Sequence, residues 1–170
     1  FGLNLHPRLN NFRVLDKRCI DLVRFCGKLN IPVVIDGFPD GNSLISDFKI
    51  SDFGKLCKKC NQTNIILAHA GGIYCIEAML MAKRIKNLYL NIAYTLLYYR
   101  DSSVTKDLIY CIKSLKGNKI FFGTDYPDRN YSSTIKLSIK ELKKFKISKD
   151  VLKKIMYKNA SEFIKMYEKS

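Results

Sequence analysis

The chain has 170 residues, of which 47% are hydrophobic, and a formal net charge of +15. This length and this apolar fraction suit one globular domain over residues 1–170 and argue against intrinsic disorder. No window reaches the ~20 consecutive apolar residues of a membrane span, and no signal peptide opens the chain, so we expect a cytoplasmic protein without a membrane partner.

The positive charge does not by itself predict a specific nucleic-acid partner. Lysines are spread between apolar positions of expected helices, and no RNA-binding signature is present. Six cysteines without a secretory signal indicate reduced thiols rather than a disulfide framework. Cys57 and Cys60, in "CKKC", have metal-like spacing, but no second Cys or His pair follows at zinc-finger distance. We therefore interpret this segment as a helix face.

Short apolar runs alternate with longer amphipathic segments along the chain. We expect strands at 2–6, 31–36, 64–69, 88–93 and 119–125. The 3.6-residue spacing of apolar side chains predicts helices at 15–30, 47–60, 73–86, 104–116, 132–145 and 148–167. Ser148 is the expected N-cap that separates the last two helices. This alternation, at a spacing of ~30 residues, is typical of right-handed βαβ units around a parallel sheet.

Histidine, aspartate and asparagine side chains lie at or near the carboxyl ends of the expected strands. They are His6, Asp36, His69, Asn91 and Asp125, and they include both histidines of the chain. A single strand-end aspartate is often only a helix cap or a turn former. Two His and two Asp at one sheet edge, however, can converge on a point where a divalent metal binds or where protons are transferred.

Three motifs resemble those of the amidohydrolase superfamily in their order and separation: "ILAHAGG" (66–72), "FFGTDYP" (121–127) and "IMYKNASEFI" (155–164). The opening "GLNLHP" resembles the fourth strand of the amidohydrolase-related branch, which includes aminocarboxymuconate-semialdehyde decarboxylases and dicarboxylate lactonases. Members of that branch are (β/α)8 TIM barrels. The resemblance implies an α/β chain that supplies only strands four to eight, a partial barrel. It also implies a structural role for Asn159 and Ala160 in the last helix.

The resemblance implies roles for the strand-end residues. Asp125 matches an aspartate that ligates the metal and accepts a proton from the attacking water. His69 matches a histidine that polarises water or substrate, or ligates a second metal. Asp36 stands where relatives have a histidine ligand, so the implied metal set is Asp125, Asp36 and His69. A divalent metal ion is implied, Zn²⁺ foremost, with Mn²⁺ or Mg²⁺ possible because a carboxylate replaces a histidine.

Substrate contacts are expected from Arg129 and His6. A guanidinium near the strand ends can hold a substrate carboxylate in a bidentate manner, although Arg8, Arg100 and Arg129 are each also consistent with a solvated surface arginine. Tyr94, Tyr98 and Tyr99 could line a pocket, but we interpret them as packing of a helix on the barrel wall. Gly71 and Gly72 are expected to let the turn after His69 approach a substrate closely.

Two departures from the family pattern set the alternatives. Strands one to three are absent together with the His-x-His pair of strand one. Asp36 stands in place of the strand-five histidine, which is compatible with a metal site of different preference and equally with a lost site. Open strand edges would be an aggregation hazard, so we expect an N-terminal segment, a partner polypeptide or a homo-oligomer to complete the barrel. The first residue, Phe1, favours truncation of a longer protein.

The sequence thus favours a metal-dependent hydrolase, or a non-oxidative decarboxylase, of a small carboxylated substrate. The alternative is a catalytically decayed barrel relative with a binding or assembly role. A deoxyribonuclease-like member is a third possibility that only the +15 charge supports.

Overall fold

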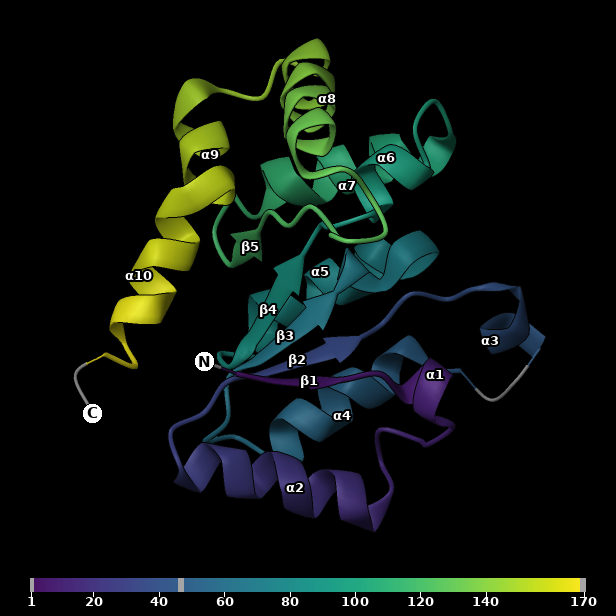
Figure 1. Cartoon of the computed structure of the whole chain (residues 1–170), viewed down its shortest axis with the longest axis vertical. Helices are drawn as coiled ribbons and strands as arrows, with labels where there is room; N and C mark the ends of the chain where they lie inside the picture. The colour runs from purple at the N-terminus through teal and green to yellow at the C-terminus, as the bar shows by residue number, and fades with distance from the viewer. Residues whose placement is uncertain (1, 46–47, 169–170) are drawn as a thin grey trace.

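The structure, a computed structural model, describes residues 2–45 and 48–168. Five parallel strands form one sheet in which they lie in chain order (Figure 1). The strands are β1 Leu3–Leu5, β2 Val33–Asp36, β3 Ile65–Ala68, β4 Leu88–Asn91 and β5 Ile120–Phe121. Each strand lies within a predicted range, and the predicted parallel sheet is confirmed.

The long helices follow the predicted ranges closely. The helices before β4 are α1 Pro7–Asn10, α2 Lys17–Lys28, α3 Gly41–Ile45, α4 Ile50–Lys59, the 3₁₀ segment η1 His69–Tyr74, and α5 Cys75–Arg84. After β4 come α6 Thr95–Tyr98, α7 Ser103–Ser114, α8 Tyr131–Lys144, α9 Lys149–Lys153, the π-helical η2 Lys154–Lys158, and α10 Asn159–Lys165. The predicted start of one helix, residue 47, lies outside the described residues.

The end of the chain is divided as the sequence predicts. Ser148 caps α9, because its hydroxyl accepts a hydrogen bond from the backbone N–H of Val151 at 3.3 Å. The single helix predicted over 148–167 is instead three consecutive segments, since the π-helical turn η2 interrupts the α-helical hydrogen bonding.

One face of the sheet is closed by the crossover helices. Alternate side chains of the strands point into this layer and are completely buried: Val33, Ile35, Ile65, Leu67 and Leu88 each have 0% exposure. Helices α2, α4, α5 and α7 contribute the opposing apolar side chains (Figure 1). Burial of this alternating set supplies the main hydrophobic stabilisation of the sheet.

The opposite face of the sheet is covered only in part. Phe163 of α10 packs edge-on against Tyr89 and Phe121, with ring centroids 4.9 and 5.2 Å apart. Beside this contact, an apolar cavity of about 320 Å³ lies between α10 and the sheet, and Val34 and Ile66 are among its lining residues. In a closed barrel this face would be the interior, where side chains of the other strands would fill such a space.

Asn159 anchors the last helix to the sheet. Its side-chain amide donates hydrogen bonds of 2.7 Å to the carbonyl oxygens of Gly117 and Ile120. The backbone N–H of Phe122 adds a hydrogen bond of 3.0 Å to the carbonyl of Ile155 in η2. These contacts support the structural role that the family resemblance implies for Asn159.

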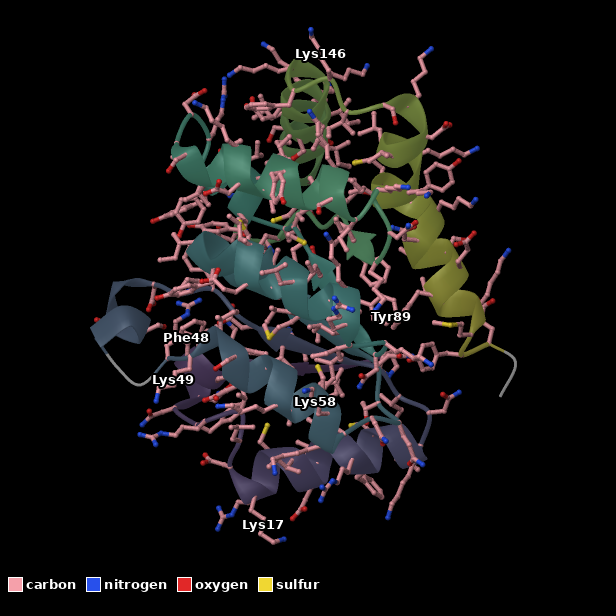
Figure 2. All side chains as sticks on the ribbon, turned by 180° about the vertical axis from the view of Figure 1, so that it is seen from behind. Lys17, Phe48, Lys49, Lys58, Tyr89 and Lys146 are labelled. Carbon is pink, nitrogen blue, oxygen red and sulfur yellow. The ribbon has the colours of Figure 1, made fainter. Side chains whose placement is uncertain are left out.

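The positive charge is distributed over the whole surface. Lys17 and Lys146 lie at opposite ends of the molecule, and Lys58 lies between them (Figure 2). This distribution agrees with the absence of a basic block in the sequence. In the described ranges, no helix is both long and apolar enough to cross a membrane.

Candidate functional site

The parallel register brings Asp36 and His69 together at the carboxyl edge of the sheet. Asp36, the last residue of β2, is paired with Ala68 of β3, and His69 follows Ala68 directly. His69 Nε2 lies 3.1 Å from Asp36 Oδ1. The ring N–H does not point squarely at this oxygen, which has no aligned hydrogen bond within the described residues, so we treat the contact as an ion pair.

The ring and backbone of His69 are held by β4 and the segment that follows it. Its Nδ1 lies 2.9 Å from the carbonyl oxygen of Ala93, which can only accept, so Nδ1 carries a proton. The Thr95 hydroxyl donates a 2.6 Å hydrogen bond to the His69 carbonyl. Asn91, in turn, accepts a hydrogen bond from the Ala93 N–H at 2.8 Å. The Nε2 atom is therefore the one that faces Asp36.

Basic side chains surround Asp36. His6 Nδ1 and Arg8 Nε lie 3.6 and 3.5 Å from Asp36 Oδ2, and Arg8 also pairs with Asp40 at 3.0 Å. Burial raises the pKa of Asp36, which is only 5% exposed, but the contact with His69 and the charges of His6, His69 and Arg8 outweigh burial and lower it. The carboxylate is thus ionised at neutral pH.

His69 shows the complementary effect. Burial lowers the pKa of its imidazole, but the contact with Asp36, the hydrogen bond to Ala93, and the negative charges of Asp36 and Asp125 together raise it. The protonated ring can satisfy Asp36 and the Ala93 carbonyl at once. The site therefore favours an imidazolium next to a carboxylate.

Asp125 and Arg129 lie on the loop after β5. Asp125 is half-buried, has a left-handed backbone conformation with φ 60°, and accepts a backbone hydrogen bond from Arg129 N–H at 3.2 Å. Its carboxylate makes no side-chain hydrogen bond or ion pair with the part of the chain that the structure describes. The guanidinium of Arg129 lies 4.5 Å from the ring centroid of Tyr94, and its buried Nε has no hydrogen-bond partner there.

The predicted metal set is only partly brought together. Asp36 and His69 are in contact, but they are paired with each other and with Arg8. In residues 2–45 and 48–168, no group of three or more His, Cys, Asp or Glu side chains is arranged to hold a metal ion. The donor atoms of the described residues therefore do not form a complete metal site by themselves, and the metal-ligand roles of Asp36, His69 and Asp125 stay predictions.

The structure adds residues that the sequence did not single out as part of the site. Phe38 packs edge-on against His69, with ring centroids 5.6 Å apart, and also contacts Tyr94 at 5.2 Å. Tyr94 itself lies 6.0 Å from the His69 ring, so the tyrosines after β4 flank the site as well as pack on helices. Arg8 is an internal ion-pair partner, whereas Arg100 lies by α8 and pairs with Glu141. Only the tyrosine spacing hinted at this environment.

Gly71 and Gly72 serve packing as well as conformation. Both have positive φ, 77° and 56°, which favours glycine. A Cβ on Gly72 would lie 2.6 Å from Pro39 Cδ, and one on Gly71 would lie 2.9 Å from Ile50 Cδ1. The close approach in this structure is therefore to the chain's own residues, which fixes the turn after His69.

These features define a class of protein: an α/β domain with a five-stranded parallel sheet and with histidine and aspartate at the carboxyl ends of its strands. The amidohydrolase family profile matches residues 1–165, and the chain belongs to the amidohydrolase family. A search of curated protein sequences found no match.

Several solved structures are similar to this fold. An uncharacterised TIM-barrel protein from Bordetella bronchiseptica has a TM-score of 0.73 and 22% identity over 92% of this chain and 53% of its own. A dihydroorotase from Campylobacter jejuni has a TM-score of 0.66 and 21% identity over 97% of this chain and 58% of its own. A probable 2-pyrone-4,6-dicarboxylic acid hydrolase from Acinetobacter baumannii, with citric acid bound, has a TM-score of 0.62. It is 18% identical over 95% of this chain and 62% of its own. The chain thus spans a little over half the length of these proteins.

Proposed function

We propose that this chain carries the acid–base residues of an amidohydrolase-type hydrolase, or a non-oxidative decarboxylase, that acts on a small carboxylated substrate. The observation that supports this most is the buried His69–Asp36 pair of 3.1 Å at the carboxyl edge of the sheet. Family membership and the neighbouring, uncommitted carboxylate of Asp125 add to it. Structural ion pairs also occur in proteins, so the test must measure chemistry.

Asp125 and His69 would have different tasks. Asp125 accepts the proton of the attacking water, because its carboxylate is not committed to a side-chain partner in the described part of the chain. His69, as an imidazolium, polarises the substrate carbonyl and stabilises the negative charge that develops there. Phe38 and Tyr94 exclude water from the ring of His69.

Arg129 and His6 are the proposed substrate-binding residues. The guanidinium of Arg129 stacks on Tyr94 and makes no ion pair with the described residues, so its charge is available for a substrate carboxylate. His6 lies beside Asp36 and is 28% exposed, which leaves part of its ring accessible. The citric acid bound to the Acinetobacter protein is consistent with a carboxylate ligand.

We also propose that residues 1–170 form one domain that is the C-terminal portion of a barrel. A further segment with the first three β/α units, or a second copy of the chain, would cover the outer edges of β1 and β5 and the cavity beneath α10. The six buried, unpaired cysteines fit a reducing compartment such as the cytoplasm.

The test uses the native polypeptide that contains this sequence, with 2-pyrone-4,6-dicarboxylate as the first probe substrate. We expect Asp125→Asn to lower kcat by a factor of about 10² to 10⁴, because the base that accepts the proton is lost. Asp128→Asn is the matched control: Asp128 is an exposed carboxylate three residues away, and its loss should leave kcat unchanged. Full turnover by the Asp125→Asn variant would refute the proposed role.

A catalytically decayed relative with a binding role is the second candidate. The observation that favours it is that no group of three metal-binding side chains occurs in the described residues. It predicts that citrate binds, with Arg129→Gln weakening the binding, while no probe ester or lactone is hydrolysed. Turnover that depends on Asp125 would exclude this candidate.

A further inference from the structure

The surroundings of Asp36 raise a question that the proposed function leaves open: why a carboxylate stands at this strand end. Asp36 is 5% exposed, and an ionised carboxylate is costly to bury unless positive charge compensates it. His69, His6 and Arg8 lie within 3.1 to 3.6 Å of its two oxygens. His69 and Arg8 thus bring positive charge to this carboxylate from within the chain.

We propose that Asp36 is a positioning residue for His69 rather than a metal ligand, and that Arg8 supplies the positive charge that a metal ion would otherwise bring to this carboxylate. The proposal rests on the proposed function, because it takes His69 to be the group that acts on the substrate. It differs from the family-based expectation for this position.

The orientation of His69 supports the positioning role. Its Nδ1–H donates to the Ala93 carbonyl at 2.9 Å, and Nε2 lies 3.1 Å from Asp36 Oδ1. The two contacts on opposite sides of the ring define its plane and its protonation, in the way that a carboxylate orients a catalytic histidine. A metal on Nε2 would have to displace Asp36 from this atom.

The place of Arg8 supports the second half of the proposal. Arg8 follows β1, and Asp40 holds its Nη1 at 3.0 Å, so that Nε is directed at Asp36 Oδ2 at 3.5 Å. A divalent cation bound to Asp36 would therefore sit close to a guanidinium of the same sign, and the two would repel each other. Asp40 is itself held by Ser43, whose N–H and hydroxyl both donate to Oδ1 at 2.8 Å.

The first measurement is the affinity for Mn²⁺, which electron paramagnetic resonance detects. Mn²⁺ suits carboxylate and imidazole donors, whereas the six cysteines would compete with the site for Zn²⁺. We expect Asp36→Asn and the unmodified chain to bind Mn²⁺ equally, and Arg8→Met to bind it at least about tenfold more tightly because a repelling charge is gone. Arg8→Lys keeps the charge and should behave like the unmodified chain. A loss of Mn²⁺ affinity of tenfold or more in Asp36→Asn would overturn the proposal.

The second measurement is ¹⁵N nuclear magnetic resonance of the imidazoles, which is tractable because the chain has only two histidines. Asp36→Asn should change the ¹⁵N shifts and protonation of His69. Asp40→Asn, the matched control, removes another partner of Arg8 but does not contact His69, and should leave the signals unchanged. Unchanged His69 signals in folded Asp36→Asn would overturn the positioning role.

A failure of the proposed function and a failure of the proposal for Asp36 and Arg8 give different results. Neither measurement needs a substrate, so a chain that turns over no probe substrate still reports on Asp36 and Arg8. If Asp36→Asn does not fold, the Arg8→Met and Arg8→Lys variants still decide whether Arg8 excludes a metal, because Arg8 is 30% exposed and lies outside the core. Equal Mn²⁺ affinities for these two variants would also contradict the proposal.

Discussion

The two aspartates at the sheet edge are held in opposite ways. Asp36, at the end of β2, lies within 3.6 Å of His6, His69 and Arg8 and has a lowered pKa. Asp125, after β5, is half-buried and has no side-chain hydrogen bond or ion pair with the described residues. The same residue type thus supplies a fixed charge at one strand end and an available one at the other.

The difference indicates that one carboxylate, Asp36, serves stability and that the other, Asp125, is available for chemistry. A group that is fully engaged holds its neighbours in place, whereas a group with free oxygens can accept a proton or bind a ligand. Variants that remove one aspartate at a time should therefore affect different quantities.

The largest stability effect is expected when Asp36 is removed. Asp36→Ala should lower the free energy of unfolding by about 2–3 kcal/mol, because His69 and Arg8 lose the charge that compensates them. Asp125→Asn should change it by no more than about 0.5 kcal/mol, because asparagine tolerates the left-handed backbone conformation of this position. Urea denaturation of both variants measures the difference. Equal losses of stability would contradict the distinction between the two aspartates.

A pH dependence of intermediate size is expected from the same pair. The folded pKa of His69 is raised above 6.5, so its contribution is complete below that pH and is lost as pH rises through the folded value. The folded pKa of Asp36 is lowered below 3.8, so its contribution is present above 3.8 and is lost as pH falls through the folded value. The pair should stabilise most between 3.8 and 6.5.

Thermal unfolding at several pH values checks this expectation. The Tm difference between the unmodified chain and Asp36→Asn should be largest in that window and should shrink on both sides. A difference that stays constant with pH would mean that the ion pair does not contribute through its charges.

The smallest effect is expected from Arg129. Arg129→Gln should weaken citrate binding by a factor of about 5 to 10, or about 1 kcal/mol, because one charge-assisted contact is lost. Stability should hardly change, since the guanidinium stacks on Tyr94 without an ion-pair partner in the described ranges. Calorimetric titration with citrate measures the affinity, and Arg100→Gln is the control because Arg100 lies by α8. An equal loss in both variants would indicate a general effect of charge.

Most of the fold was predictable because it depends on local patterns. Runs such as "NIILAH" have the length and β-branched content of a buried parallel strand, and the segments between strands have helical spacing. The interruption at η2 was not predictable, since a π-helical turn depends on how the last helix packs on β5 through Asn159. Helix spacing alone cannot report such a contact.

The site was predictable in part, because some of its features also depend on local patterns along the chain. The sequence placed His69 and Asp36 at neighbouring strand ends, and their contact follows from the parallel register. It did not predict that Arg8 would neutralise Asp36, or that Phe38 would pack on His69. Both contacts join residues at or just after the ends of different strands, and the distance between them is set only by the packed sheet.

The elements, their order and the residue types at the carboxyl edge thus follow from the amino-acid sequence alone, because these depend on spacing along the chain. Which of those side chains neutralise each other, and which stay available, depends on the packed fold. Charge compensation depends on distances of 3 to 4 Å between segments that are far apart in sequence. Such distances arise only when the helices have packed on the sheet and the loops are held in place.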